Sequence, residues 1–142
     1  MPLYPNLDRL LLKRSGWKLL PSSFVPSSKL KFLYITRVED IEYVPEEGIG
    51  NLTLLEELEI EDCPNLVSLP DQGMGRLISL QRLHISRCPK LASLPEGLRC
   101  LASLKKLKIE DCPILKQRCQ KETGEDWSKI AHIPEIYNGV FF

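Results

Sequence analysis

LEELEIEDCPNLVSLP, residues 55–70, returns with few changes as LQRLHISRCPKLASLP at residues 80–95. A third copy, LKKLKIEDCPIL, begins at residue 104. The copies start 25 and 24 residues apart. Self-similarity at such a period is typical of solenoid proteins, in which each repeat is one structural unit. Because stacked units expose a long continuous surface, solenoids usually bind other macromolecules.

Alignment of the same pattern to the preceding residues shows two further copies, which are more divergent. The five repeats are predicted to start at Leu7, Leu30, Leu55, Leu80 and Leu104. Residues 1–115 are therefore interpreted as repeats, and residues 116–142 as a C-terminal capping segment. In that segment, the apolar side chains expected to cover the fifth repeat are Trp127, Ile130, Ile133 and Ile136.

Each repeat opens with a predicted strand, because apolar and polar residues alternate there, as in Leu58-Glu59-Ile60. Proline fixes φ and lacks an N–H donor, so each strand is expected to end at the following Cys-Pro step. Strands are predicted near residues 9–12, 31–36, 56–61, 81–86 and 105–110. The predicted fold class is an α/β solenoid: an arc with a parallel β-sheet on its concave face, a mostly irregular convex side with little regular helix before residue 113, and a C-terminal cap.

The overall composition excludes several classes of protein. Lys and Arg total 19, as do Asp and Glu, so the net charge is zero and nothing points to nucleic acid. No apolar run approaches the roughly 18 residues of a membrane span. The N-terminus lacks the basic start and apolar stretch of a secretory signal, which favours a cytosolic or nuclear protein.

The five cysteines are interpreted as free thiols. Cys63, Cys88 and Cys112 occupy one slot of the repeat, and an odd total does not suit a framework of disulfides. No pair has the short Cys-x-x-Cys spacing of a zinc knuckle. An unpaired cysteine behaves as a small hydrophobic residue, so the three are expected to line the inner side of successive turns, reduced and metal-free.

The strand residues that alternate with the buried ones form columns across the predicted sheet. The candidate partner-binding residues on this concave face are Phe32, Tyr34, Glu57, Glu59, Glu61, Arg82, His84, Lys106 and Lys108. Two interpretations stay open. Exposed aromatic residues beside Arg dominate binding hot spots, which favours a recognition surface. Alternatively, Glu57–Arg82 and Glu59–His84 are cross-strand pairs that support the sheet.

Signals for an enzyme are weak. The two histidines, His84 and His132, lie far apart in the repeat order, and most cysteines fill buried slots, so no Cys/His nucleophile pair is indicated. Neighbouring carboxylates on one strand are more typical of a solvated face than of a metal site. No catalytic residue, no cofactor and no metal site is predicted.

The repeat has a specific form: Cys-Pro-x-Leu-x-Ser-Leu-Pro, then Gly-Leu-x-x-Leu-x-Ser-Leu-x-x-Leu. The tail contains Leu115-Lys-Gln-Arg-Cys119 and, further on, Gly124-Glu-Asp-Trp127-Ser-Lys-Ile130-Ala-His132-Ile133-Pro134. This combination resembles the C-terminal leucine-rich repeats of plant intracellular nucleotide-binding leucine-rich-repeat (NLR) disease-resistance proteins. The family's phosphate-binding loop, Gly-x-x-x-x-Gly-Lys-Ser/Thr, does not occur in this chain, so no residue here is expected to bind ATP or ADP.

The resemblance implies a protein-interaction module in plant defence. Its implied partners are proteins: a pathogen effector, a guarded host protein, or the upstream nucleotide-binding domain of the same receptor, which the module would restrain. Two alternatives stay open. One is a free-standing cytosolic leucine-rich-repeat scaffold. The other is a repeat-linked ubiquitin ligase with a catalytic cysteine. A reactive thiol at Cys100 or Cys119 would favour this alternative.

The N-terminal end carries a separate expectation. The first repeat begins within six residues of Met1, so Leu10, Leu12, Trp17 and Leu20 would form an uncovered apolar end. Capping by Leu3, Tyr4 and Pro5 is the alternative. Since solenoids need a cap at both ends, the chain is expected to be a fragment of a longer array that self-associates through this end.

Overall fold

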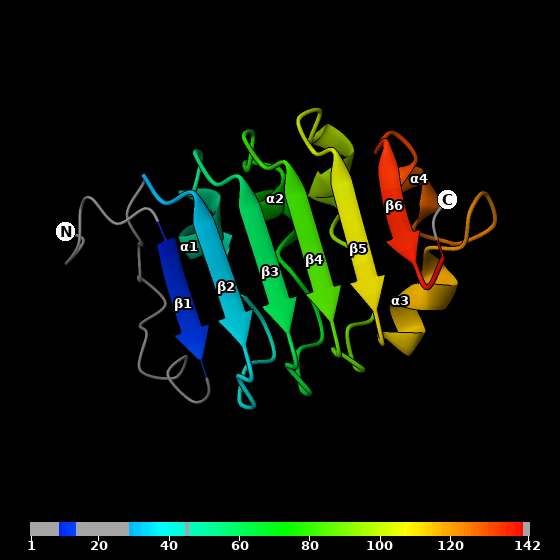
Figure 1. The fold of residues 1–142 in the computed structure, drawn as a ribbon, viewed down its shortest axis with the longest axis horizontal. Coiled ribbons are helices and arrows are strands. Elements are labelled where there is room, and N and C mark those ends of the chain that lie inside the picture. The colour runs from blue at the N-terminus through cyan, green and yellow to red at the C-terminus, as the bar shows by residue number, and fades with distance from the viewer. Residues whose placement is uncertain (1–8, 14–28, 45, 141–142) are drawn as a thin grey trace.

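Six parallel strands form one continuous sheet in the computed structural model, which describes residues 9–13, 29–44 and 46–140 (Figure 1). The strands follow one another across the sheet in the order of the chain. They are β1 (Arg9–Lys13), β2 (Phe32–Thr36), β3 (Glu57–Glu61), β4 (Arg82–Ser86), β5 (Lys106–Glu110) and β6 (Glu135–Asn138). The first five confirm the predicted strands, whereas β6 was not predicted.

The alternation of side chains gives the sheet one buried and one open face. In β3, Leu58 and Ile60 are buried, and the glutamates beside them are half-exposed. The register aligns Leu33, Leu58 and Leu83 across neighbouring strands, and Leu107 and Ile136 continue the row. The predicted stacking of equivalent leucines in one column is therefore confirmed, and the column extends one strand further than expected.

Short helices follow the strands; those between β2 and β5 lie behind the sheet in Figure 1, and those after β5 lie near β6 at its end. They are α1 (Glu46–Gly50), α2 (Asp71–Met74), a 3-10 helix, η2 (Glu96–Cys100), α3 (Pro113–Arg118) and α4 (Trp127–Ile130). α1 packs on α2, α2 on η2, and η2 on α4. The prediction of little regular helix before residue 113 needs refinement, because each segment returning from β2, β3 and β4 forms one short helical turn.

A column of glycines permits this helix packing. Gly48, Gly73 and Gly97 share one slot of the repeat. A Cβ at Gly73 would lie 2.6 Å from Ile49 Cγ2, and one at Gly97 would collide with the backbone of Gly75. Neighbouring helical turns thus approach at their backbones, which explains a residue that otherwise disfavours helices.

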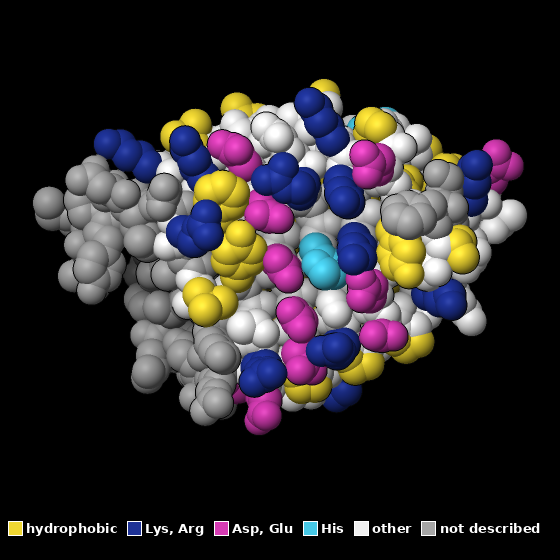
Figure 2. All heavy atoms as spheres, viewed as in Figure 1, with side chains coloured by type: hydrophobic (Ala, Val, Ile, Leu, Met, Phe, Trp, Pro, Cys, Tyr) yellow, Lys and Arg dark blue, Asp and Glu magenta, His cyan; other side chains and the backbone are white. Residues whose placement is uncertain are grey.

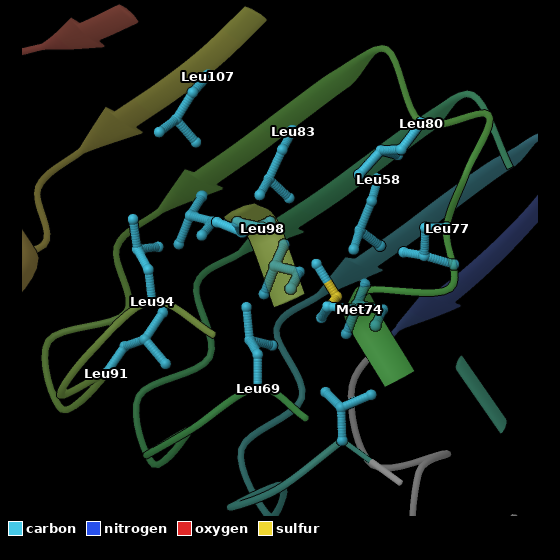
Figure 3. Packing of buried hydrophobic residues seen from close by; sticks show 14 of the residues in the cluster. Leu58, Leu69, Met74, Leu77, Leu80, Leu83, Leu91, Leu94, Leu98 and Leu107 are labelled. Carbon is cyan, nitrogen blue, oxygen red and sulfur yellow. The ribbon is translucent and has the colours of Figure 1, made fainter. Parts of the chain in front are cut away.

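The core lies between the sheet and the helices (Figure 3). Leu58, Leu83 and Leu107 reach into it from the strands, and Met74 and Leu98 meet them from the opposite side. Each of these side chains is at most 1% exposed. Burial of such side chains stabilises the fold by about 1.5–3 kcal/mol each, and no single repeat could provide that burial alone.

The shared cysteine slot lies in this core. Cys63, Cys88 and Cys112 are at most 2% exposed. Each Sγ–H points to the carbonyl oxygen two residues earlier, at 3.6, 3.4 and 3.2 Å respectively. A small apolar side chain with a weak donor fits this position. The predicted burial is confirmed, and the redox and metal-free states stay predictions.

The chain turns earlier than the proline rule predicted. Each strand from β2 to β5 is followed directly by a residue in the left-handed region, with φ between 52° and 59°. These residues are Arg37, Asp62, Arg87 and Asp111. The first three donate their N–H groups to the next strand's last carbonyl, at 2.8–3.0 Å. The turn therefore begins before the Cys-Pro step.

The C-terminal segment joins the same core. Ile130, Ile133 and Ile136 are buried, and Trp127 packs against them partly exposed. The division into repeats up to 115 and a cap from 116 stays a prediction. The side chains of Leu10 and Leu12, together with Leu3, Tyr4, Pro5, Trp17 and Leu20, lie outside the described residues.

A buried ionic cluster attaches this segment to the preceding turn of chain. The Asp126 carboxylate, 0% exposed, accepts hydrogen bonds from Arg118 Nε and Nη2 at 3.0 Å and from the Leu94 N–H at 2.9 Å. Lys129 Nζ lies 2.8 Å from Asp126 Oδ1 and donates to the Leu94 carbonyl at 2.7 Å. Every charge in the cluster is paired, as burial requires.

Candidate partner-binding face of the sheet

All nine predicted binding residues lie on the open face of the sheet, on strands β2 to β5. Lys106 is exposed and the other eight are half-buried. We call this surface, including the matching residues of β1 and β6, the sheet face. The in-register pairing brings Phe32, Glu57, Arg82 and Lys106 into one row, and Tyr34, Glu59, His84 and Lys108 into the next.

Residues at both ends of these rows were missing from the predicted set. Arg9 and Leu11 of β1 extend them on one side, and Glu135 and Tyr137 of β6 extend them on the other. The signal for β6 was present in the alternation Glu135-Ile136-Tyr137. It was hidden because the tail departs from the repeat template.

The sheet face changes character from strand to strand. Figure 2 shows apolar side chains over β1 and β2, a stripe of acidic groups over β3, and a histidine with basic groups over β4 and β5. The acidic stripe consists of Glu57, Glu59 and Glu61. Opposite charges on adjacent strands make this surface polarised along the sheet, although the whole chain is neutral.

Cations lie over aromatic rings near both ends of the sheet face. The Arg9 guanidinium carbon is 4.7 Å from the centre of the Phe32 ring. Lys108 Nζ is 5.6 Å from the centre of the Tyr137 ring. Such contacts stabilise by about 0.5–1 kcal/mol at exposed sites.

Tyr34, Glu57 and Arg82 form a chain of polar contacts across three strands. The Tyr34 hydroxyl donates to Glu57 Oε2 at 3.0 Å, and Arg82 Nε lies 3.4 Å from Glu57 Oε1. Burial, and then the hydrogen bond to Glu57, raise the pKa of Tyr34 above its ordinary value. The phenol is therefore a neutral donor with a defined orientation.

A second chain of contacts runs from β3 to β5. His84 Nδ1 lies 3.5 Å from Glu59 Oε1, and His84 Nε2 lies 3.8 Å from Glu110 Oε1. Lys108 Nζ is 2.8 Å from the same Glu110 oxygen. That hydrogen bond lowers the pKa of Glu110 and raises the pKa of Lys108, so both stay charged. The cross-strand pairs expected from the sequence are thus formed.

A hollow of about 190 Å³ opens on the sheet face between β1, β2 and β3. We call it the β1–β3 hollow. It is lined by Leu11, Tyr34, Ile35, Thr36, Glu59 and Glu61. Of the nine predicted residues, it brings together Tyr34, Glu59 and Glu61, while the remaining six lie beyond its lining. Within the described ranges, no group of three or more His, Cys, Asp or Glu side chains is placed to hold a metal ion.

Comparison with known proteins connects this chain to plant disease resistance. The disease resistance RPP8-like protein 3 of Arabidopsis thaliana is 42% identical over 109 residues, which make up 76% of this chain and 9% of that protein. The chain is a relative of plant disease resistance proteins. This confirms the disease-resistance part of the resemblance.

Two Solanum bulbocastanum proteins that are also named for disease resistance match shorter stretches. RGA4 is 50% identical over 42 residues, or 30% of this chain, and RGA1 is 60% identical over 25 residues, or 18%. The chain spans 9% or less of the length of these three curated relatives. No family model matches it. In the part of the chain that the structure describes, no helix has the length and apolar character needed to cross a membrane.

Proposed function

We propose that this chain is a protein-interaction module of a plant immune receptor, built as a leucine-rich-repeat solenoid that binds its partner through the sheet face. The observation that carries the proposal is the in-register stacking of repeated strands. It gathers one side chain from each repeat into continuous rows on an open surface. Solenoids commonly use such a surface for binding.

The residue types repeat on the buried face of the strands and vary on the sheet face. On the buried face, the slot of Leu58 holds leucine in each of the strands β2 to β5, and the slot of Ile60 holds isoleucine. On the sheet face, one row reads Phe, Glu, Arg, Lys and the next reads Tyr, Glu, His, Lys. A repeated core with unrepeated surface rows supports a surface specialised for a particular partner.

The similarity to resistance proteins supports a role in defence. In the family that the repeats resemble, this region senses a pathogen effector or a guarded host protein and restrains the nucleotide-binding domain. We propose the same role here, in the cytoplasm or the nucleus. Sequencing the genomic reading frame upstream of Met1 tests this part, because a phosphate-binding loop encoded there would connect the module to such a receptor.

We propose that the chain is not an enzyme. The thiol of Cys119 is buried, and burial raises its pKa to about 12, which makes it a poor nucleophile. This supports the proposal over a ubiquitin ligase with a catalytic cysteine. Cys100 is exposed, so a direct test is whether the purified chain accepts ubiquitin from a charged conjugating enzyme. No thioester on Cys100 is expected.

Site-specific crosslinking tests the proposed binding surface. A photo-reactive phenylalanine analogue replaces Phe32 or Tyr137 on the sheet face and, as a control, the exposed Ile78 outside the strands. The chain is then expressed in leaf tissue challenged with pathogen. We expect a common crosslinked protein from both sheet-face positions and none from the control.

The charge-reversed variant Glu57→Lys/Glu59→Lys provides the second half of the test. It should retain the fold and lose the crosslinks, because both side chains lie in the centre of the sheet face. Equal crosslinking of the folded variant, or crosslinks from the control position alone, would move the site off this face.

A further inference from the structure

The β1–β3 hollow combines two kinds of wall. One part of the lining is largely apolar: it includes Leu11, which is 56% exposed, and Tyr34. The other wall consists of Glu59 and Glu61, two residues apart on the same side of β3. A side chain that fits must therefore bring a long apolar stem and a polar end.

Among the residues that the structure describes, the ion pairs of these two carboxylates are long. Glu59 Oε1 lies 3.5 Å from His84, and Glu61 Oε1 lies 3.3 Å from Arg87. Both distances exceed the roughly 2.7–2.9 Å of a charge-assisted hydrogen bond. By comparison, Lys108 Nζ and Glu110 Oε1, on the basic half of the sheet face, lie 2.8 Å apart. Each contact uses one oxygen of a carboxylate that can accept on two, so within the described part of the chain both carboxylates retain acceptor capacity.

Charge decides which side chain can enter. The acidic stripe repels an anionic group, and a purely apolar group would remove water from Glu59 and Glu61 without replacing it, which is costly. A cationic group satisfies both carboxylates. The methylene stem of Arg or Lys packs on apolar surface while its charged end stays polar, and its cation is attracted to the face of a tyrosine ring.

We propose that the β1–β3 hollow accepts a cationic side chain of the protein partner, with arginine preferred over lysine. The preference follows from geometry, because a planar guanidinium can donate to two acceptors at once. Tyr34, held by its hydrogen bond to Glu57, provides a fixed wall for the stem. This inference rests on the proposed function, and it names the chemistry of the partner that binds there.

The test uses a matched pair of small probes on the full chain. Nα-acetyl-arginine methylamide and its neutral analogue Nα-acetyl-citrulline methylamide are titrated into ¹⁵N-labelled protein, and backbone amide shifts are recorded. The arginine probe should bind in the millimolar range and shift the amides of Tyr34, Thr36, Glu59 and Glu61. The citrulline probe should bind about tenfold more weakly, as expected for loss of a hydrogen bond to a charged group.

Two variants with the same change of charge complete the design. Glu59→Gln/Glu61→Gln should weaken binding of the arginine probe by about tenfold or more. Glu122→Gln/Glu125→Gln removes two exposed charges outside the sheet face and should leave it unchanged. Dispersed amide spectra of both variants confirm that the fold is kept.

Several results would overturn the inference: equal binding of the two probes, equal weakening by the two variants, or shifts spread over all acidic residues. Crosslinks from the sheet face without arginine binding would overturn it while leaving the proposed function intact. Arginine-specific binding in the hollow, together with crosslinks from the control position alone, would support the hollow's preference for cations. It would contradict the proposal that the partner binds the sheet face.

Discussion

Asp126 is a single buried charge on which the packing of the C-terminal segment depends. Its carboxylate is fully buried, and Arg118 and Lys129 both bind it. A buried ion pair adds little net stability compared with apolar residues of the same size, but removing one partner is costly, since the other charge is then left uncompensated. The cluster is therefore a point at which the C-terminal segment is sensitive to small chemical changes.

We expect Asp126→Asn to lower the free energy of unfolding by about 3 kcal/mol, because Lys129, only 6% exposed, would keep only its longer ion pair with Glu96, at 3.4 Å. Urea unfolding followed by circular dichroism measures this. Glu125→Gln is the matched control: the Glu125 side chain is 76% exposed, and its contact with Arg118 should be worth less than about 1 kcal/mol. Equal losses in the two variants would contradict the role of the buried cluster.

The same carboxylate predicts an acid-dependent loss of stability. Burial raises the pKa of Asp126, but hydrogen bonds from Arg118, Lys129 and the Leu94 N–H outweigh it, so the net pKa in the folded protein lies below the ordinary value. Such a group contributes stability above its unfolded pKa of about 3.9 and loses it as the pH falls through the folded pKa. Melting temperatures between pH 7 and pH 2 should therefore fall more steeply in the native chain than in Asp126→Asn. Parallel curves would contradict the assignment.

At the scale of elements, the stacking of short helical turns depends on glycine. α2 is a helix of four residues and η2 has five, so neither would be stable in isolation. They are ordered by packing on each other, and through Met74 and Leu98, which join the strand leucines in the core. Gly97 lies where η2 meets the backbone of Asp71 and Gly75. The spacing between successive repeats is thus set partly by the absence of a side chain.

Gly97→Ala should destabilise the fold by about 1–3 kcal/mol, since its Cβ would collide with backbone atoms that cannot move aside. Gly50→Ala is the control: the nearest atom is the flexible Arg76 Cδ at 3.2 Å, and alanine favours a helix over glycine. Its effect should stay within about 0.5 kcal/mol. Thermal and urea unfolding measure the stability of both variants. An unchanged stability of Gly97→Ala would contradict the prediction, because it would show that η2 can shift.

At the scale of the whole molecule, one apolar core runs through every described repeat. It contains Leu30 near one end and Ile136 near the other. Each repeat contacts its neighbours, so stability approximates a sum of repeats and the interfaces between them. A defect in a central repeat therefore weakens two interfaces, whereas one in a terminal repeat weakens one.

Leu83→Ala tests this continuity, because Leu83 lies between Leu58 and Leu107 in the column. We expect a loss of about 2–5 kcal/mol. Hydrogen exchange should show reduced amide protection in β3 and β5 as well as in β4. Loss of protection confined to β4 would mean that the repeats unfold independently. Ile85→Val, which removes a single methyl group from the same strand, should cost only about 0.5–1.5 kcal/mol.

Local sequence patterns predict strands β1 to β5, their parallel order and the side of each strand that faces the core. These follow from local alternation and from a period that places Leu58 and Leu83 in equivalent slots. The same alternation placed residues such as Glu57 and His84 on the sheet face. Within this pattern, one residue predicts its counterpart in the next repeat.

Three features lie outside the repeat template and form only in the folded chain. β6 forms because Ile136 packs at the end of the leucine column, beside Leu107. Tyr137 lies on the sheet face as a consequence. The buried Asp126–Lys129 cluster and the β1–β3 hollow likewise combine groups from segments far apart in the chain. No local pattern marks the cluster or the hollow, because their energies come from contacts that exist only when the repeats are stacked.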